Sequence, residues 1–182
     1  MKYNLILSIA TSAILVSCNN ISNDKAPVPT KEPSKAEAVA QRFYSEVCDK
    51  HNIAMIDTLV DAAFMDHSPD MGYTADIAGL KKDFAELYIA YPDLSIKSDF
   101  MITEGDLVSA HVIMTGTNSG PMGDMPATNK KVNVEGVDIL RVKDGKITEH
   151  WGYMDQAKMM EQLGQMPEMN ASADKDKGKD KK

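Results

Sequence analysis

The amino-acid sequence predicts an α+β fold, a cone-shaped barrel in which N-terminal helices pack on a curved, mainly antiparallel sheet. Apolar residues recur at helical spacing in the first half of the folded region, up to about residue 91. Between residues 94 and 154 they alternate as in strands, with turn residues between the segments. Helices followed by a meander are typical of the α+β class. A long sheet wrapped around helices leaves one open end, where we expect a small pocket.

The helical half is expected to begin near Ser34, because serine favours the position before the first turn of a helix. The first helix then has one apolar face, made of Val39, Phe43 and Val47. A later amphipathic helix ends at Pro92, because proline cannot continue it. The segments between these points are a helical piece over 52–62 with Ile53, Ile56, Leu59 and Val60 inward, a strand over 63–67 and the later helix over 75–91.

Four strands and a short helix are expected in the second half. Glu104-Gly105-Asp106 and Lys143-Asp144-Gly145 are turns between consecutive strands, and a Gly- and Pro-rich loop covers 117–129. On the first strand, Leu94, Ile96, Phe100 and Ile102 share one parity. The strands are placed at 94–102, 107–116, 130–142 and 146–154, and the helix at 156–163, before Gly164.

The N-terminus predicts export. Residues 1–17 combine a lysine, a short apolar run and small residues, which is typical of a signal peptide and too short for a membrane span. Leu15-Val16-Ser17-Cys18 resembles the bacterial lipobox, which implies acyl chains such as palmitate on Cys18 and a lipid-anchored protein of the bacterial cell envelope. Residues 18–35 are polar and Pro-rich, as in a disordered tether. Asn19, rather than Asp, favours the outer membrane over the inner one.

The charge composition of the chain argues against some classes of binding partner. The chain has a net charge of −7, and residues 36–170 hold 22 Asp and Glu against 11 Lys and Arg. An acidic domain repels phosphate backbones, so we expect no nucleic-acid partner. Residues 167–182 are low in complexity and are expected to be a disordered Lys/Asp-rich tail. Cys48, the one cysteine besides Cys18, is expected to be a small buried hydrophobe.

Several short motifs, in order, resemble the SnoaL-like polyketide cyclase or ester cyclase family of the nuclear transport factor 2-like superfamily. The resemblance covers about residues 36–166. The motifs are Tyr91-Pro92-Asp93-Leu94, Glu104-Gly105-Asp106, Gly116-Thr117-Asn118-Ser119-Gly120, Met125-Pro126-Ala127-Thr128, Arg141-Val142-Lys143-Asp144-Gly145-Lys146-Ile147 and Glu149-His150-Trp151. The resemblance implies a cone-shaped α+β barrel, often a homodimer, that closes a polyketide ring by aldol condensation without metal or cofactor.

Two departures from the family pattern affect the chemistry. The resemblance implies an Asp that removes and returns protons two positions after the last-strand His, but Gly152 stands there. It also implies a His on the preceding strand, where this chain has Asp138. A third difference lies in the loop, where Asn118 replaces a His of the family. The fold therefore carries over, whereas the mechanism does not carry over residue by residue.

Asp138 and His150 are the candidate catalytic residues. Asp138 shares its strand face with apolar residues, and an acid there is costly unless it is paired or hydrated. If residues 143–145 form a three-residue loop, residue 142 pairs with 146 and Asp138 lies opposite His150. The carboxylate would then raise the pKa of the imidazole, and the pair is a relocated general base. A two-residue turn at Asp144-Gly145 would instead put the two side chains on opposite faces.

Three further residues are candidate substrate-binding positions: His67, Trp151 and Asn118. His67 lies near the cone mouth by the resemblance, or else caps a turn at Ser68-Pro69. Trp151 alternates with Ile147 and Tyr153, opposite His150, which also fits sheet packing or a dimer face. No metal-ligand spacing is present in the sequence.

Three functions remain open on these grounds. The first is cofactor-free acid/base chemistry, like that of an ester cyclase, on a small apolar carbonyl compound. The second is non-catalytic binding of a small hydrophobic molecule, which the missing acid at Gly152 favours. The third is an envelope interaction module that pairs through the Trp151 face.

Overall fold

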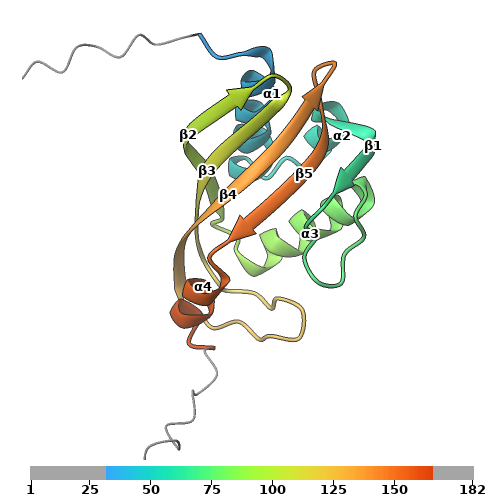
Figure 1. Cartoon of the computed structure of the whole chain (residues 1–182). Helices are drawn as coiled ribbons and strands as arrows, with labels where there is room; N and C mark the ends of the chain where they lie inside the picture. The colour runs from blue at the N-terminus through green and yellow to red at the C-terminus, as the bar shows by residue number, and fades with distance from the viewer. Residues whose placement is uncertain (1–31, 166–182) are drawn as a thin grey trace, which may run out of the picture. The chain divides into compact units, whose positions relative to one another are not determined.

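A five-stranded sheet with the order β1-β5-β4-β3-β2 is the frame of the fold, as the computed structural model shows for residues 32–165 (Figure 1). The strands are β1 (Val60–Asp66), β2 (Ser95–Glu104), β3 (Leu107–Thr117), β4 (Lys131–Lys143) and β5 (Lys146–Met154). All neighbours are antiparallel except β1 and β5, which are parallel. The predicted α+β class with a mainly antiparallel sheet is confirmed. The signal segment 1–17, Cys18, most of the tether 18–35 and the tail 167–182 lie outside the described residues.

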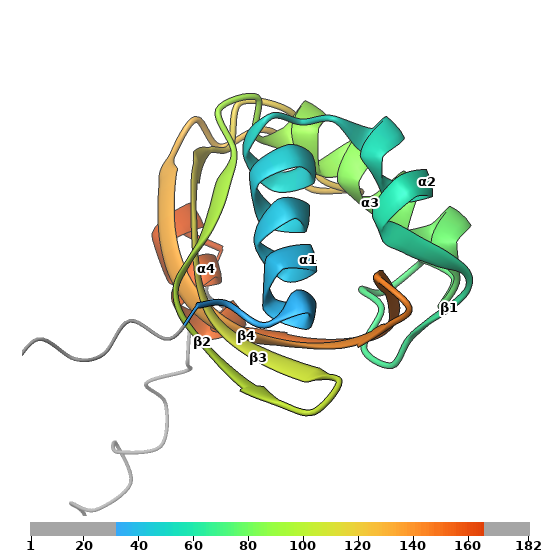
Figure 2. The same ribbon diagram turned by 90° about the horizontal axis from the view of Figure 1, so that it is seen from above.

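Helices cover the concave side of this sheet. Seen from above, the sheet curls around α1, and α2 and α3 close the side next to β1 (Figure 2). Ser34 caps α1 by accepting a hydrogen bond from the Glu37 amide, as predicted, a contact worth about 1 kcal/mol. The helical elements are α1 (Lys35–Phe43), the π-helix η1 (Tyr44–Asp49), the 3-10 helix η2 (Ile53–Met55), α2 (Ile56–Leu59), α3 (Ile77–Ala90) and α4 (Gln156–Leu163).

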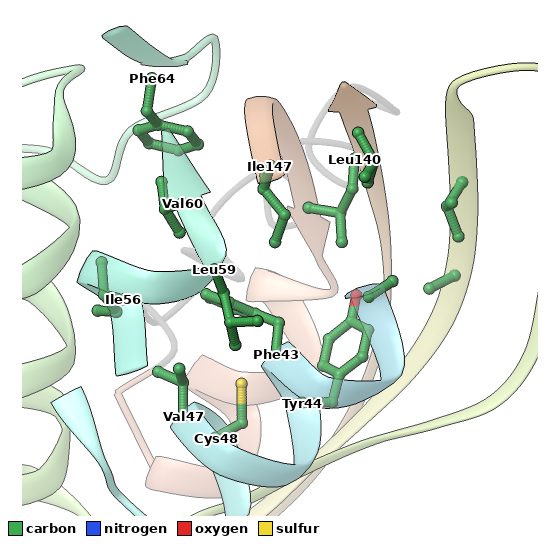
Figure 3. Close-up of a cluster of buried hydrophobic side chains, with 14 of the residues drawn as sticks. Phe43, Tyr44, Val47, Cys48, Ile56, Leu59, Val60, Phe64, Leu140 and Ile147 are labelled. Atoms are coloured by element: carbon green, nitrogen blue, oxygen red, sulfur yellow. The ribbon is translucent and has the colours of Figure 1, made fainter. Parts of the chain in front are cut away.

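The main core lies between the sheet and the first helices (Figure 3). Phe43, Val47 and Cys48 from α1 and η1 are at most 8% exposed, which confirms the predicted burial of Cys48. They meet Leu140 and Ile147 from the sheet. The predicted helical piece 52–62 is shorter than expected, because Val60 already has extended backbone and begins β1.

Two bulges correct the predicted strand faces. The β2–β3 register shifts between Ser98 and Phe100, so Phe100 and Ile102 are 55% and 66% exposed and do not continue the inward parity of Ile96. The β4–β5 register shifts between Arg141 and Val142. Ile147 is therefore buried in the core, and the prediction that it shares an outer stripe with Trp151 and Tyr153 was wrong.

The hairpin between β4 and β5 has a two-residue turn followed by a bulge on β5. Asp144 and Gly145 have φ of 50° and 79°, as in a two-residue turn, and Lys143 pairs with Lys146. The pairing of Val142 with Lys146 and of Asp138 with His150, which a three-residue loop would give, does not occur. The bulge leaves Thr148 as an extra residue on β5, so Asp138 pairs with Gly152 and Leu140 pairs with His150. This extra residue returns Asp138 and His150 to the same face of the sheet.

Candidate functional site

Three ionisable side chains from three strands meet on the inner face of the sheet. His150 on β5 is flanked by its neighbour Asp66 at the end of β1 and by Asp138, diagonally across on β4. His150 Nδ1 lies 3.1 Å from Asp66 Oδ2, and His150 Nε2 lies 3.5 Å from Asp138 Oδ1. The predicted juxtaposition of Asp138 and His150 is confirmed, although the register that produces it differs. Their catalytic role stays a prediction.

Two hydroxyl groups complete the cluster. Tyr44, on η1, donates a hydrogen bond of 2.9 Å to Asp138 Oδ2. Ser68, just after β1, accepts a hydrogen bond of 2.6 Å from the Gly152 amide. The backbone amide of Ser68 also donates a hydrogen bond of 2.9 Å to Asp66 Oδ1. The loop after β1 is thus fixed to β5, and this holds Asp66 beside His150.

Gly152 leaves an open space that the His150 ring uses. A Cβ atom at position 152 would lie 2.8 Å from His150 Cε1 and 3.3 Å from Asp138 Oδ1. The first distance is shorter than any contact between non-bonded carbon atoms, so any side chain at this position would displace the imidazole. The glycine therefore allows the ring to lie over residue 152 and to approach Asp138.

The two carboxylates hold His150 in its charged form. Burial lowers the pKa of His150, but hydrogen bonds to Asp138 and Asp66 outweigh burial and raise this pKa to about 9. Burial also raises the pKa of Asp66, but the bond to His150 lowers it below the ordinary value of the carboxyl. At neutral pH His150 is an imidazolium, which is suited to donating a proton rather than accepting one. The side chains of His150, Asp138 and Asp66 are 22%, 19% and 11% exposed, so solvent reaches the cluster.

A further carboxyl group, that of Asp83 on α3, interacts electrostatically with the same cluster. Burial, together with repulsion from Asp70 and Asp66, raises the pKa of Asp83 to about 7. Like charges that share a partly buried site favour protonation of one of them. The inner site therefore holds more negative than positive charge, with His150 as the cation that opposes it.

The structure does not bring His67 and Trp151 to this cluster. Trp151 pairs with Ile139 and stacks on the His67 ring at a centroid distance of 4.3 Å. His67 Nε2 lies 2.9 Å from Glu149 Oε2. Glu149 and Trp151 alternate with His150 and Gly152, so they occupy the outer face of β5, with Arg141. Their proposed role in substrate binding stays a prediction, and the contacts present are ion-pair and stacking contacts of the outer face.

Asn118 lies in the loop after β3, apart from the cluster. It is fully buried, and its amide group donates to the Gly120 carbonyl at 3.0 Å. Its side-chain oxygen accepts from the Thr128 amide and hydroxyl, both at 2.9 Å. These bonds join the two ends of the long loop 118–130, which gives Asn118 a structural function; a role in substrate binding stays a prediction.

A groove of about 200 Å³ lies between the helices and β2 rather than over His150. Its walls come from α1, η1 and β2, and they include Gln41, Ser45, Ile96 and Met101. Tyr44 also lines this groove, and its hydroxyl donates to Asp138 in the cluster. Neither His150 nor Asp138 lines this groove, so it is not a pocket over the ionisable cluster.

Sequence reasoning missed Asp66 and Tyr44. Asp66 alternates with Phe64, which is 4% exposed, and this parity was a signal that Asp66 points inward. Tyr44 also carried a signal, because the buried residues Ala40, Phe43, Tyr44 and Val47 recur at the i, i+3, i+4 and i+7 spacing of one helical face. Within residues 32–165, no group of three or more His, Cys, Asp or Glu side chains is arranged to hold a metal ion, and no helix is long and apolar enough to cross a membrane.

Comparison with known proteins identifies the family. The sequence profile described as SnoaL-like polyketide cyclase matches residues 38–163. The chain belongs to this family. A polyketide cyclase-like protein of known crystal structure from Bacillus cereus is 32% identical; the match covers 73% of this chain and 83% of that one, with a TM-score of 0.63. The SnoaL-like domain thus has the expected cone-shaped fold.

Two curated relatives from Streptomyces are ester cyclases. The aklanonic acid methyl ester cyclase of Streptomyces peucetius is 26% identical over 105 residues, which are 56% of this chain and 68% of that protein. The nogalonic acid methyl ester cyclase of Streptomyces nogalater is 33% identical over 60 residues, which are 33% of this chain and 45% of that protein. The chain therefore spans about half to two thirds of the length of these SnoaL-like relatives.

Proposed function

We propose that this SnoaL-like domain performs cofactor-free acid/base chemistry on a small apolar carbonyl compound, with Asp138 and His150 as its catalytic residues. One observation carries the proposal. Asp138 Oδ1 lies 3.3 Å from the Cβ position at residue 152, where the family resemblance implies a catalytic Asp. Asp138 is also the cross-strand partner of Gly152. The carboxylate that is missing on β5 is thus supplied from β4 beside the same space.

The charges assign a direction to the proton transfers. Asp138 acts as the base and removes a proton from the carbon next to an ester carbonyl, which gives an enolate. The enolate carbon attacks a second carbonyl of the same molecule and forms the ring bond. His150 gives its Nε2 proton to the resulting alkoxide, and the proton on Asp138 then returns to His150. At 3.5 Å the contact of Nε2 with Asp138 is at the limit of a hydrogen bond, so the Nε2 proton is available to a substrate oxygen.

The proposal is tested with the methyl esters of aklanonic acid and nogalonic acid, which the curated relatives are named for. We expect the wild type to cyclise these esters slowly. The rate should fall by roughly 10²-fold or more in Asp138→Asn and in His150→Gln. His111→Gln is the matched control, because His111 also bonds a carboxylate, Asp99, at 2.7 Å, but on the outer face. Equal rates in all four proteins would contradict the assignment.

Non-catalytic binding is the alternative, and the bare position at Gly152 favours it. In this case the domain captures a small hydrophobic molecule at the envelope without turning it over. Native mass spectrometry of the protein purified from its own cells separates the two readings. A bound small molecule together with no turnover of either ester supports binding alone.

The location in the cell is also a proposal. The lipobox-like Leu15-Val16-Ser17-Cys18 supports acylation of Cys18 and anchoring to the envelope, with Asn19 favouring the outer membrane. Cys18→Ser is expected to move the protein from the membrane fraction to the soluble one. Retention of this variant in membranes would contradict the lipid anchor.

A homodimer is proposed through the outer face of the sheet. Phe100, Val137 and Tyr153 lie in one cross-strand row with His111 and are 38% to 60% exposed. Exposed apolar rows of this kind are typical of protein contact sites. Tyr153→Ser together with Val137→Ser is expected to lower the mass measured by light scattering from dimer to monomer; a wild-type monomer would contradict the proposal.

A further inference from the structure

Tyr44 is the buried aromatic residue that connects the helices to the ionisable cluster. It is 5% exposed, and its ring is directed toward the sheet, close to Leu140 (Figure 3). It is the first residue of η1, where the helix changes from α to π geometry directly after Phe43. Single π turns of this kind are frequent at functional sites. Its hydroxyl donates to Asp138 Oδ2 at 2.9 Å.

The two oxygens of Asp138 have different neighbours. Oδ2 accepts the hydrogen bond from Tyr44, whereas Oδ1 faces His150 Nε2 and the space over Gly152. The contact of 3.5 Å between Oδ1 and Nε2 is too long to fix the carboxylate by itself. The side chain is also 19% exposed, so water competes for its oxygens. The orientation of Oδ1 must therefore be held from the other oxygen.

We propose that Tyr44 is a positioning residue, which holds the Asp138 carboxylate with Oδ1 turned toward His150 and toward the space over Gly152. The catalytic meaning of this role rests on the proposed function, but the positioning itself does not. A hydroxyl that donates to a carboxylate in a partly buried site forms a strong and directional bond. Without it, we expect the carboxylate to turn toward water and the contact with His150 to open.

Several other groups face His150, so the test must isolate the contribution of Tyr44. They are Asp66 at the end of β1, Asp70 in the loop after it, Asp83 on α3 and Asp138 on β4. Tyr44→Phe changes none of these charges. It keeps the aromatic ring and removes only the hydroxyl that donates to Asp138. A change at His150 in this variant therefore reports on the orientation of Asp138.

The experiment is an NMR titration of the His150 ring in the full-length protein. We expect Tyr44→Phe to lower the pKa of His150 to a value between those of the wild type and Asp138→Asn. Tyr91→Phe is the matched control, because Tyr91 is fully buried and its hydroxyl has no hydrogen-bond partner within the described residues. The control is expected to leave the pKa of His150 unchanged. A pKa of His150 in Tyr44→Phe that equals or exceeds the wild-type value would overturn the proposal.

A double variant keeps the result independent of general effects on the fold. If Tyr44 acts through Asp138, then Tyr44→Phe has no further effect on the His150 pKa when Asp138→Asn is already present. An equal fall in both backgrounds would show that Tyr44 acts by another route and would also overturn the proposal. In an ester cyclisation assay, Tyr44→Phe is expected to lower kcat and leave KM unchanged. An inactive wild type would count against the proposed function alone, because the titration still decides the role of Tyr44.

Discussion

His150 and Asp138 lie on the same face of the β4–β5 hairpin because one residue, Thr148, is inserted between the turn and His150. The two-residue turn at Asp144-Gly145 alone would place them on opposite faces, since side chains alternate along a strand. The register shift between Arg141 and Val142 restores the parity and leaves Nε2 and Oδ1 3.5 Å apart. A bulge next to a functional site often aims a side chain in this way.

Gly152→Ala is expected to lower the pKa of His150 from about 9. The new Cβ would lie 2.8 Å from His150 Cε1, so the ring must move away from its position beside Asp138. The measurement is an NMR titration of the His150 ring. Gly116→Ala is the control, because its Cβ would press on Tyr91, at 3.2 Å, and not on His150. Equal His150 titrations in Gly152→Ala and the wild type would show that the ring does not need the glycine.

Asp83→Asn is expected to stabilise the protein at alkaline pH and not at acidic pH. The pKa of Asp83 is about 7 in the folded protein and about 4 when unfolded, so its stabilising effect is complete below pH 4 and is lost as pH rises to 7. Asparagine does not ionise, so the variant does not lose stability as pH rises. We expect its free energy of unfolding at pH 8 to exceed that of the wild type by about 1–2 kcal/mol. Urea unfolding at pH 4 and pH 8 measures it. A difference between the two proteins that does not change with pH would contradict the shift.

His150 also stabilises the folded protein more at low pH than at high pH, but its contribution is lost at a higher pH than that of Asp83. Its pKa rises from 6.5 to about 9 on folding, so the contribution is complete below pH 6.5 and disappears as pH rises through 9. We therefore expect His150→Gln to destabilise the protein at pH 6 by more than at pH 10. The opposite trend in His150→Gln would mean that His150 is neutral in the folded protein.

The positions of most elements follow from the sequence, and the geometry of the site does not. Apolar periodicity locates the helices and strands because burial sets it, and the Ser34 cap follows from side-chain chemistry. The bulges after Ser98 and at Thr148 leave no mark in the apolar pattern, yet each reverses the faces that follow it. Tyr44, by contrast, continues the buried helical face of Ala40 and Phe43, so its burial follows from the helical spacing. The site is therefore built from Asp66 and Tyr44 as well as from Asp138 and His150.

Asn118→Ala is expected to destabilise the protein by about 2 kcal/mol without changing the pKa of His150. The substitution leaves the Thr128 amide and hydroxyl and the Gly120 carbonyl without their buried partner. Thermal unfolding and the His150 titration measure the two effects separately. A shift of the His150 pKa with unchanged stability would instead assign Asn118 to the functional site.

The central claim is that Asp138 and Asp66 hold His150 as an imidazolium at neutral pH on the inner face of the sheet. Its most direct test is the NMR titration of His150 in the wild type and in Asp138→Asn. The structure predicts a wild-type midpoint near pH 9 and a clearly lower midpoint in the variant. A wild-type midpoint near 6.5, or the same midpoint in both proteins, would contradict the account.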